Sequence, residues 1–248
     1  MQVVGHRGAP KEAFENSFLA YECAISGDAD RIELDVHLLK DNSLVISHDP
    51  DLKYAVGQSL NCAEASRNDV KKMQLKDGSE IPFLDEVLDR YVNKIEFNIE
   101  IKENRTETAE QVLKLIRARN CQSRIVVSSF QPEMVQFYAE KEPTMRRACL
   151  WGPDFKWPNV ADYSPLRIME FASATILHPY VHLVDEGLMD QARHRGWEIV
   201  PYVGLKNDDE ATGREALWSK LKDFGVSGLC SNYPRELRRW LNNESSKL

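Results

Sequence analysis

Residues 31–36 read Arg-Ile-Glu-Leu-Asp-Val, and apolar and acidic side chains alternate along them. Successive side chains of a β-strand point to opposite faces of the sheet. This run therefore predicts a strand with one apolar face and with Glu33 and Asp35 together on the other. Residues 97–102, Phe-Asn-Ile-Glu-Ile-Lys, predict a second strand of the same kind, in which Glu100 and Lys102 lie opposite the apolar face.

Six further short runs of apolar or β-branched residues recur along the chain. The eight predicted strands are 2–5, 31–36, 95–101, 124–128, 147–151, 174–178, 198–203 and 226–230. Most are separated by stretches long enough for a helix, and alternation of strands and helices predicts a parallel sheet. Eight such units in 248 residues favour one domain over 1–248, a single α/β barrel of the TIM type, (β/α)₈. The long polar segment 50–80 predicts a small excursion after the second strand.

The composition limits the classes of partner. The net charge of −7 argues against a nucleic-acid-binding surface, which needs clustered Lys and Arg. No apolar run approaches the length of about 18–20 residues that a membrane span requires. The five cysteines form no CxxC pair and indicate neither a zinc site nor a disulfide framework. We expect a cytoplasmic protein that acts on a small molecule, and the sequence leaves a homodimer open.

Three carboxylates should meet at one end of the barrel. The apolar faces of barrel strands meet the surrounding helices, so Glu33, Asp35 and Glu100 should point inward near the C-terminal ends of their strands, where active sites of such barrels lie. A cluster of this kind is unfavourable unless protons, basic residues or a metal neutralise it. Oxygen ligands favour one hard divalent ion, Mg²⁺ or Ca²⁺, with Mn²⁺ as a further candidate. Pairing with Arg or Lys inside the barrel is the alternative.

Two histidines should reach the same end of the barrel. His6 directly follows the first predicted strand. His48 follows an apolar run that can fold back on the second strand, and a hairpin centred between Asp41 and Asn42 places Asp35 opposite His48.

These side chains together indicate a class of reaction. Two histidines can supply a general base and a general acid, because histidine changes protonation near neutral pH. Arg7 and Lys102 add the positive charge needed to hold a phosphate. Phosphoryl transfer depends on positioning and on stabilising developing negative charge, which a cation, an arginine and a lysine can do together. The constellation predicts phosphoryl transfer but leaves the substrate open.

The first hundred residues resemble the glycerophosphodiester phosphodiesterase family. The matching motifs, in order, are His6-Arg7-Gly8, Glu15-Asn16-Ser17, Ile32-Glu33-Leu34-Asp35, Lys40-Asp41, Ser47-His48-Asp49 and Asn98-Ile99-Glu100-Ile101-Lys102. The resemblance implies metal ligation by Glu33, Asp35 and Glu100, acid–base catalysis by His6 and His48, and phosphate contacts from Arg7 and Lys102. It also implies hydrolysis of glycerophosphodiesters, such as glycerophosphocholine or glycerophosphoethanolamine, to sn-glycerol 3-phosphate and an alcohol.

The resemblance further implies a mechanism in which the glycerol 2-hydroxyl of the substrate attacks phosphorus and water opens the resulting cyclic phosphate. Two stretches depart from the family pattern. Pro201-Tyr202-Val203-Gly204 stand where the family often has a Trp-Thr-Val-Asn-like stretch, and Ser231-Asn232 stand where a Thr-Asp pair is common. These departures leave the predicted catalytic set intact and bear on the shape of the glycerol or leaving-group pocket.

Two alternative functions remain open at this point. A lysophospholipase D or a sphingomyelinase D-like phospholipase could share the metal and the histidines, and a non-catalytic barrel could bind a phosphorylated ligand. Five further side chains fall near predicted strand ends, but packing is their commoner role there, so the predicted site omits them. They are Phe130, Trp151, His178, Tyr180 and Tyr202.

Overall fold

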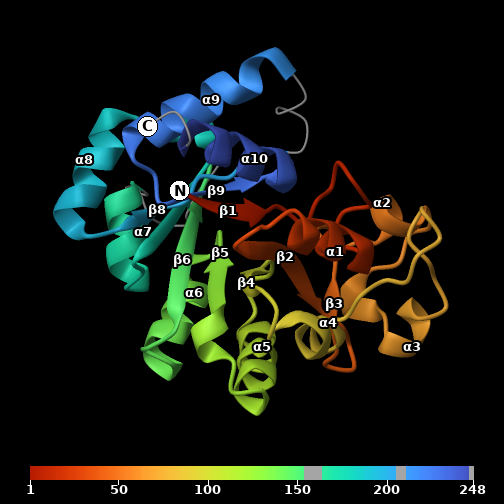
Figure 1. Cartoon of the computed structure of the whole chain (residues 1–248). Helices are drawn as coiled ribbons and strands as arrows, with labels where there is room; N and C mark the ends of the chain where they lie inside the picture. The colour runs from red at the N-terminus through yellow and green to blue at the C-terminus, as the bar shows by residue number, and fades with distance from the viewer. Residues whose placement is uncertain (154–163, 205–210, 246–248) are drawn as a thin grey trace.

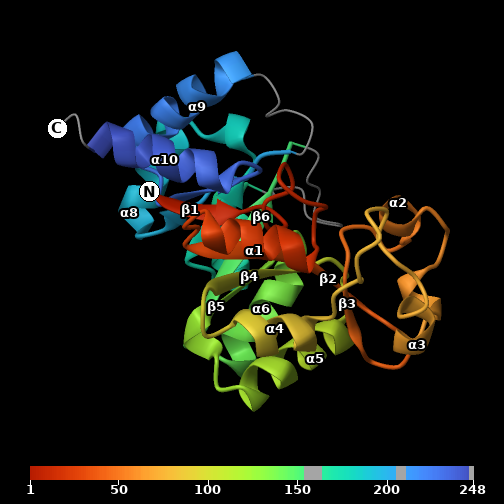
Figure 2. The same cartoon turned by 45° about the vertical axis from the view of Figure 1, so that its right-hand side comes forward.

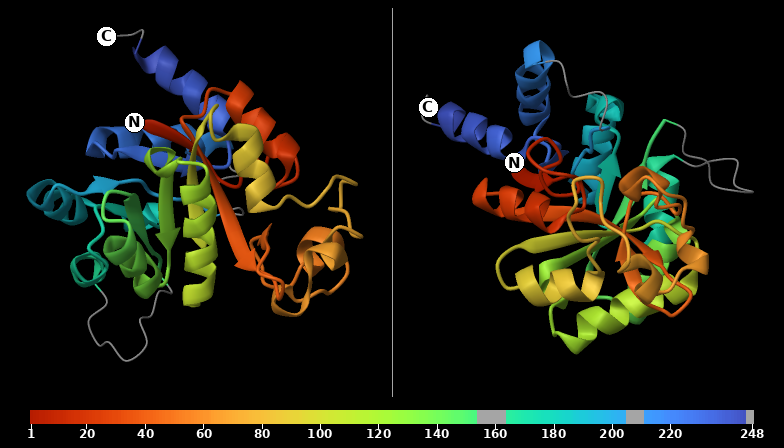
Figure 3. Two further views of the ribbon diagram at one scale, coloured as in Figure 1. Left: turned by 90° about the horizontal axis from the view of Figure 1, so that it is seen from below. Right: turned by 90° about the vertical axis from the view of Figure 1, so that its right-hand side faces the viewer.

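The computed structural model describes residues 1–153, 164–204 and 211–245, and side chains from 213 onward in the last of these ranges. Within them, eight parallel strands alternate with helices, and the helices lie outside the ring of strands (Figure 1, Figure 3). The strands of the ring are β1 (Gln2–Gly5), β2 (Arg31–Leu38), β4 (Glu96–Ile101), β5 (Ile125–Ser129), β6 (Arg146–Trp151), β7 (Ile176–Pro179), β8 (Glu198–Ile199) and β9 (Gly228–Ser231). The helices that follow them in turn are α1 (Phe18–Ser26), α4 (Leu84–Tyr91), α5 (Thr106–Ala118), α6 (Pro132–Lys141), α7 (Pro165–Ala172), α8 (Glu186–Arg195), α9 (Ala211–Phe224) and α10 (Pro234–Ser245).

The order of neighbouring strands is β8-β7-β6-β5-β4-β2-β1-β9. The ring closes between its two ends, where the amide of Ser227 donates to the carbonyl of Ile199 (2.8 Å) and the amide of Cys230 donates to that of Pro201 (2.8 Å). The predicted (β/α)₈ barrel is therefore confirmed. The predicted strand 198–203 is regular only at its first two residues, because Pro201 has no amide proton for the ladder.

The alternation predicted for β2 and β4 is also confirmed. Ile32, Leu34 and Val36 are buried in the cluster that includes the apolar faces of α4 and α5. A separate layer of small and β-branched side chains fills the inside of the barrel, from Val4, Val126, Ala148, Ile176, Val200 and Cys230. The opposite face of β2 carries the carboxylates, which therefore point inward.

The hairpin after β2 differs from the prediction by one residue. Strand β3 (Leu44–Ile46) pairs antiparallel with β2, but the residue opposite Asp35 is Ser47, whose amide donates to the Asp35 carbonyl at 3.2 Å. The predicted pairing of Asp35 with His48 is wrong. The reason is that the loop 40–42 has three residues rather than two, with Asn42 at φ 64° in the left-handed region, which is a common way to close a three-residue hairpin.

The segment 50–80 forms a small unit beside the barrel, as predicted (Figure 1, Figure 2). It contains α2 (Lys53–Val56), the 3₁₀ turn η1 (Cys62–Glu64) and α3 (Arg67–Val70). Leu52, Cys62 and Val70 of this segment share a small core with Phe83, which follows it. Arg67 ties it to α4 through both carboxylate oxygens of Asp85, each at 2.9 Å. None of the described helices has the length and hydropathy of a membrane-spanning segment.

Candidate active site

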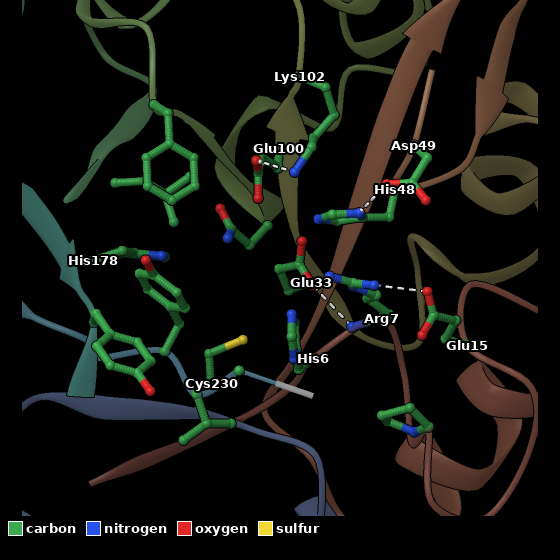
Figure 4. Close-up of a pocket in the computed structure, with 18 of the residues that line it drawn as sticks. His6, Arg7, Glu15, Glu33, His48, Asp49, Glu100, Lys102, His178 and Cys230 are labelled. Atoms are coloured by element: carbon green, nitrogen blue, oxygen red, sulfur yellow. Dashed lines mark hydrogen bonds and ion pairs between the residues drawn. The ribbon is translucent and has the colours of Figure 1, made fainter. Parts of the chain in front are cut away.

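A cavity of about 900 Å³ opens at the C-terminal ends of the strands. One side, formed by β1, β2, β4 and the segment after β3, carries the charged residues, whereas His178 lies across from them (Figure 4). The lining includes six of the seven residues predicted for the site, namely His6, Arg7, Glu33, His48, Glu100 and Lys102. The seventh, Asp35, is 1% exposed. It lies beneath the cavity lining and forms ion pairs with Arg7 and Lys102.

The three predicted carboxylates converge. Pairing of β2 with β4 sets Asp35 directly beside Glu100, and Glu33 beside Asn98. One oxygen from each of Glu33, Asp35 and Glu100 lies within 4.8 Å of the others, and all three side chains are buried. A divalent ion could contact all three.

Two cations partly neutralise the cluster. Lys102 Nζ lies 2.6 Å from Glu100 Oε1 and 3.3 Å from Asp35 Oδ1. Arg7 Nε lies 3.4 Å from Asp35 Oδ2, and the Arg7 amide donates to Glu33 Oε2 at 2.8 Å. The ion-pair alternative is thus present in the structure, but it is incomplete, because three carboxylates face two cations.

The pKa values of the carboxyl groups show where compensation is missing. Burial, followed by the charges of Asp35 and Glu100, raises the pKa of Glu33 well above its ordinary value, and burial also raises the pKa of Glu100. Burial alone would raise the pKa of Asp35, but Lys102 and Arg7 lower it overall. Glu33 and Glu100 therefore favour the protonated form unless a further cation compensates their negative charge.

The donor atoms left over also fit a metal. Glu33 Oε1 and Asn98 Oδ1 are buried, and no hydrogen-bond donor of the described residues reaches either of them. Such orphaned oxygens are rare unless an ion or water satisfies them. The ligand atoms grouped at this point are carboxylate oxygens, which is the donor set of Mg²⁺, Mn²⁺ and Ca²⁺ rather than zinc. The residues present therefore fit a divalent metal site.

His6 is held with one ring nitrogen free. Its Nδ1 donates to the side-chain oxygen of Asn232 at 2.7 Å, so the proton of a neutral ring resides on Nδ1 and Nε2 keeps its lone pair. Burial, followed by the charge of Arg7, lowers the pKa of His6 to about 3. His6 is therefore neutral near pH 7 and can accept a proton at Nε2.

His48 has the same arrangement with a charged partner. Its Nδ1 donates to Asp49 Oδ1 at 2.8 Å, and its side chain is 38% exposed. Burial and the charge of Lys102 lower the pKa of His48, while Asp35 and the bond to Asp49 act in the opposite direction. A carboxylate partner favours the protonated ring, which distinguishes His48 from His6.

Several residues of the site were absent from the predicted set. Asn16 donates to Asp35 Oδ2 (2.9 Å), and Glu15 accepts from Arg7 Nη1 (2.7 Å), so both support the ionic cluster. Asn232 was noted only as a departure from the family pattern. Four of the five side chains assigned to packing in fact line the cavity, namely Phe130, His178, Tyr180 and Tyr202.

Three aromatic side chains pack against one another in the lining of the cavity. The ring centroids of Phe130 and Tyr202 are 6.0 Å apart, and those of Tyr180 and Tyr202 are 5.6 Å apart. Gly152 makes room for this wall, because a Cβ there would lie 2.7 Å from the Tyr202 hydroxyl. We call Phe130, Tyr180 and Tyr202 the aromatic wall.

Comparison with known proteins agrees with this geometry. Residues 6–236 match the model of the glycerophosphoryl diester phosphodiesterase family. A glycerophosphodiester phosphodiesterase of Caldanaerobacter subterraneus is 25% identical over 95% of both chains, and a human lysophospholipase D is 25% identical over 98% of this chain and 87% of its own. The solved structure of an Oleispira antarctica phosphodiesterase has a TM-score of 0.81 at 19% identity, covering 98% of this chain and 97% of that one. The chain is thus a member of the glycerophosphoryl diester phosphodiesterase family.

Proposed function

We propose that this enzyme hydrolyses water-soluble glycerophosphodiesters, such as glycerophosphocholine or glycerophosphoethanolamine, to sn-glycerol 3-phosphate and an alcohol. The observation that carries the proposal is the convergence of Glu33, Asp35 and Glu100 with two histidines whose Nε2 atoms form no hydrogen bond with the described residues. The Oleispira antarctica phosphodiesterase of the same fold was solved with the product sn-glycerol 3-phosphate, which supports the same chemistry here.

One divalent ion, Mg²⁺ or Ca²⁺, would be held by the three carboxylates. When bound, it would stabilise the negative charge that develops on the phosphoryl oxygens. Arg7 and Lys102, already fixed by the carboxylates, would hold the remaining charge of the phosphate. The carboxylates therefore orient the cations as well as offering metal ligands.

His6 would act as the base and His48 as the acid. His6 is neutral, buried and hydrogen-bonded to an amide, so its Nε2 can accept the proton of the glycerol 2-hydroxyl as that oxygen attacks phosphorus. The bond from phosphorus to the alcohol then breaks, and His48, whose protonated form Asp49 favours against the opposing effects of burial and Lys102, donates a proton to the leaving oxygen. Water opens the cyclic phosphate with the two roles reversed. Absence of a cyclic intermediate together with inversion at a chiral phosphorus would contradict this route.

The two roles can be separated with leaving groups. A p-nitrophenyl ester of glycerol phosphate needs no acid, because p-nitrophenolate leaves without a proton. Single-turnover release of p-nitrophenol should therefore survive His48→Ala and be lost in His6→Ala, whereas both variants should fail on glycerophosphocholine. The reverse pattern would exchange the two assignments.

The aromatic wall favours a second candidate, a lysophospholipase D. Apolar rings facing the phosphate site could contact the choline of a diester or an apolar part of a lysophospholipid. The human relative named as a lysophospholipase D points the same way. We favour soluble diesters because the sequence shows no clear amphipathic membrane anchor.

The deciding experiment measures sn-glycerol 3-phosphate released from glycerophosphocholine by purified protein, with chelator and with added Mg²⁺ or Ca²⁺. Release should require metal and should be abolished by His6→Ala and by Glu100→Gln. His194→Ala is the matched control, since this histidine is exposed and bonds only within α8. No release from glycerophosphocholine but release from lysophosphatidylcholine would favour the second candidate. Inactivity on both would favour a barrel that binds a phosphorylated ligand without turnover.

A further inference from the structure

A buried histidine outside the cavity lining contacts the loop that carries His48. His37 lies on β2 two residues beyond Asp35, and its side chain is 3% exposed. Its Nε2 lies 3.2 Å from the backbone carbonyl oxygen of His48, and its Nδ1 lies 2.9 Å from Glu103 Oε1. One imidazole thus joins the backbone of a catalytic histidine to a carboxylate after β4.

The partners fix the direction of these bonds. A carbonyl oxygen can only accept, so His37 Nε2 carries a proton and donates it to the His48 carbonyl. Glu103 is itself held from its other side, because the hydroxyl of Thr108 donates to Glu103 Oε2 at 2.8 Å. Thr108 is fully buried in the first turns of α5. A continuous chain of hydrogen bonds therefore runs from α5 through Glu103 and His37 to His48.

Strand pairing does not hold the backbone of His48. The ladder between β3 and β2 extends to the bond between the Ser47 amide and the Asp35 carbonyl, one residue before His48. Its ring is partly exposed, and its Nδ1 bonds to the adjacent residue Asp49 rather than to a distant element. The His37 bond attaches the His48 backbone to the barrel at the point where strand pairing has stopped.

We propose that His37 is a positioning residue that sets the placement of His48 through its backbone carbonyl, with Glu103 holding His37 in turn. This inference rests on the proposed function, because it assigns His48 the task of proton donor. His37 does not touch the cavity, so its effect should follow that task and not substrate binding or metal binding.

The test compares His37→Leu with His37→Gln, whose amide can still donate to the His48 carbonyl. Glu103→Leu, whose side chain cannot accept from His37, is added as a second route to the same loss. On glycerophosphocholine, His37→Leu should lower kcat about 10- to 100-fold with little change in KM, the scale expected when a catalytic group moves by about 1 Å. His37→Gln should recover part of this loss. Single-turnover release of p-nitrophenol from the activated ester should change little in either variant.

Two controls separate positioning from general damage. Tyr138→Phe removes another buried hydrogen bond to α5, from the Tyr138 hydroxyl to the Ala109 carbonyl, and should leave kcat unchanged. In a His48→Ala background, His37→Leu should cause no further loss, because two residues acting through one group are not additive.

Each other result overturns the inference in a recognisable way. Equal loss on both substrates, a fall in metal affinity, or additive loss in the double variant would show that His37 supports the barrel generally. Full activity of His37→Leu would show that His48 does not need the bond. An inactive wild-type enzyme would overturn the proposed function and this inference together.

Discussion

Replacing Glu33 by Gln should greatly reduce the increase in thermal stability that divalent metal gives the enzyme. With every group ionised, the four carboxylates of Glu15, Glu33, Asp35 and Glu100 face the charges of Arg7 and Lys102, which leaves the cluster with a net charge of −2. The substitution halves this negative charge and removes a ligand at the same time. It should therefore weaken metal binding while relieving the metal-free protein.

The size of the effect follows from linkage. Metal at 100 times its Kd stabilises the folded state by about 2.7 kcal/mol. For a chain of this length, about 1 kcal/mol corresponds to about 2–4 °C in Tm, so saturating metal should raise the Tm of the wild type by roughly 5–11 °C. In Glu33→Gln the same concentrations of MgCl₂ or CaCl₂ should produce a much smaller shift in a thermal melt.

The pH dependence of the metal-free protein gives an independent check. The pKa of Glu33 is raised in the folded state above its ordinary value of 4.5. A carboxyl group of this kind lowers the stability of the folded protein as pH rises from 4.5 through the raised pKa, because the group releases its proton at a lower pH in the unfolded chain. Metal-free Glu33→Gln should lack this part of the decline and should equal or exceed the wild type near neutral pH. An undiminished metal shift in the variant, or no metal shift in the wild type, would refute the reasoning.

Three further predictions concern catalysis. Because burial lowers the pKa of His6 to about 3, the acid limb of the profile of kcat/KM against pH, which reports this base, should lie below 6.5; a limb above 6.5 would contradict this environment. Arg7→Lys keeps the charge but loses the planar group that spans Glu15 and Asp35. The activation free energy for kcat/KM should therefore rise by about 1.5–3 kcal/mol, and wild-type kinetics would argue against a phosphate contact. Tyr202→Ala should lower kcat/KM more for glycerophosphocholine than for glycerophosphoethanolamine, and so should Gly152→Ala, because its Cβ clashes with the Tyr202 hydroxyl. In a competition assay the two substrates should differ by about 0.5–2 kcal/mol in the activation free energy that each variant loses. Equal losses would show that the aromatic wall does not contact the alcohol.

The sequence predicted those parts of the site that depend on local periodicity. Alternation along β2 and β4 is a property of neighbouring residues, so it could place Glu33, Asp35 and Glu100 on an inward face before any contact was known. The position of that face in a barrel followed from the succession of eight strands. His6 could be placed because it directly follows β1.

Contacts between distant segments could not be predicted in this way. The bond from His6 to Asn232 joins residues 226 positions apart, and no local pattern encodes it. The register of the β2–β3 hairpin depended on whether its loop had two or three residues, and the left-handed conformation of Asn42 decided for three. Aromatic residues at strand ends serve packing and binding equally well, so Phe130 and Tyr202 could be assigned to the cavity only from the structure.

The seven residues of the predicted site come from the first 102 positions, on the adjacent strands β4, β2 and β1 and on the segment that returns along β2. The aromatic wall comes from the part of the chain that begins at β5. A chimaera that joined this N-terminal part to the C-terminal part of a relative could therefore inherit its reactivity from one parent and its choice of alcohol from the other. The hydrogen bond between His6 and Asn232 joins the two parts, so a chimaera would have to keep a partner for His6 at the position of Asn232. In evolutionary terms, this arrangement lets the range of substrates diversify while the reacting groups stay constant.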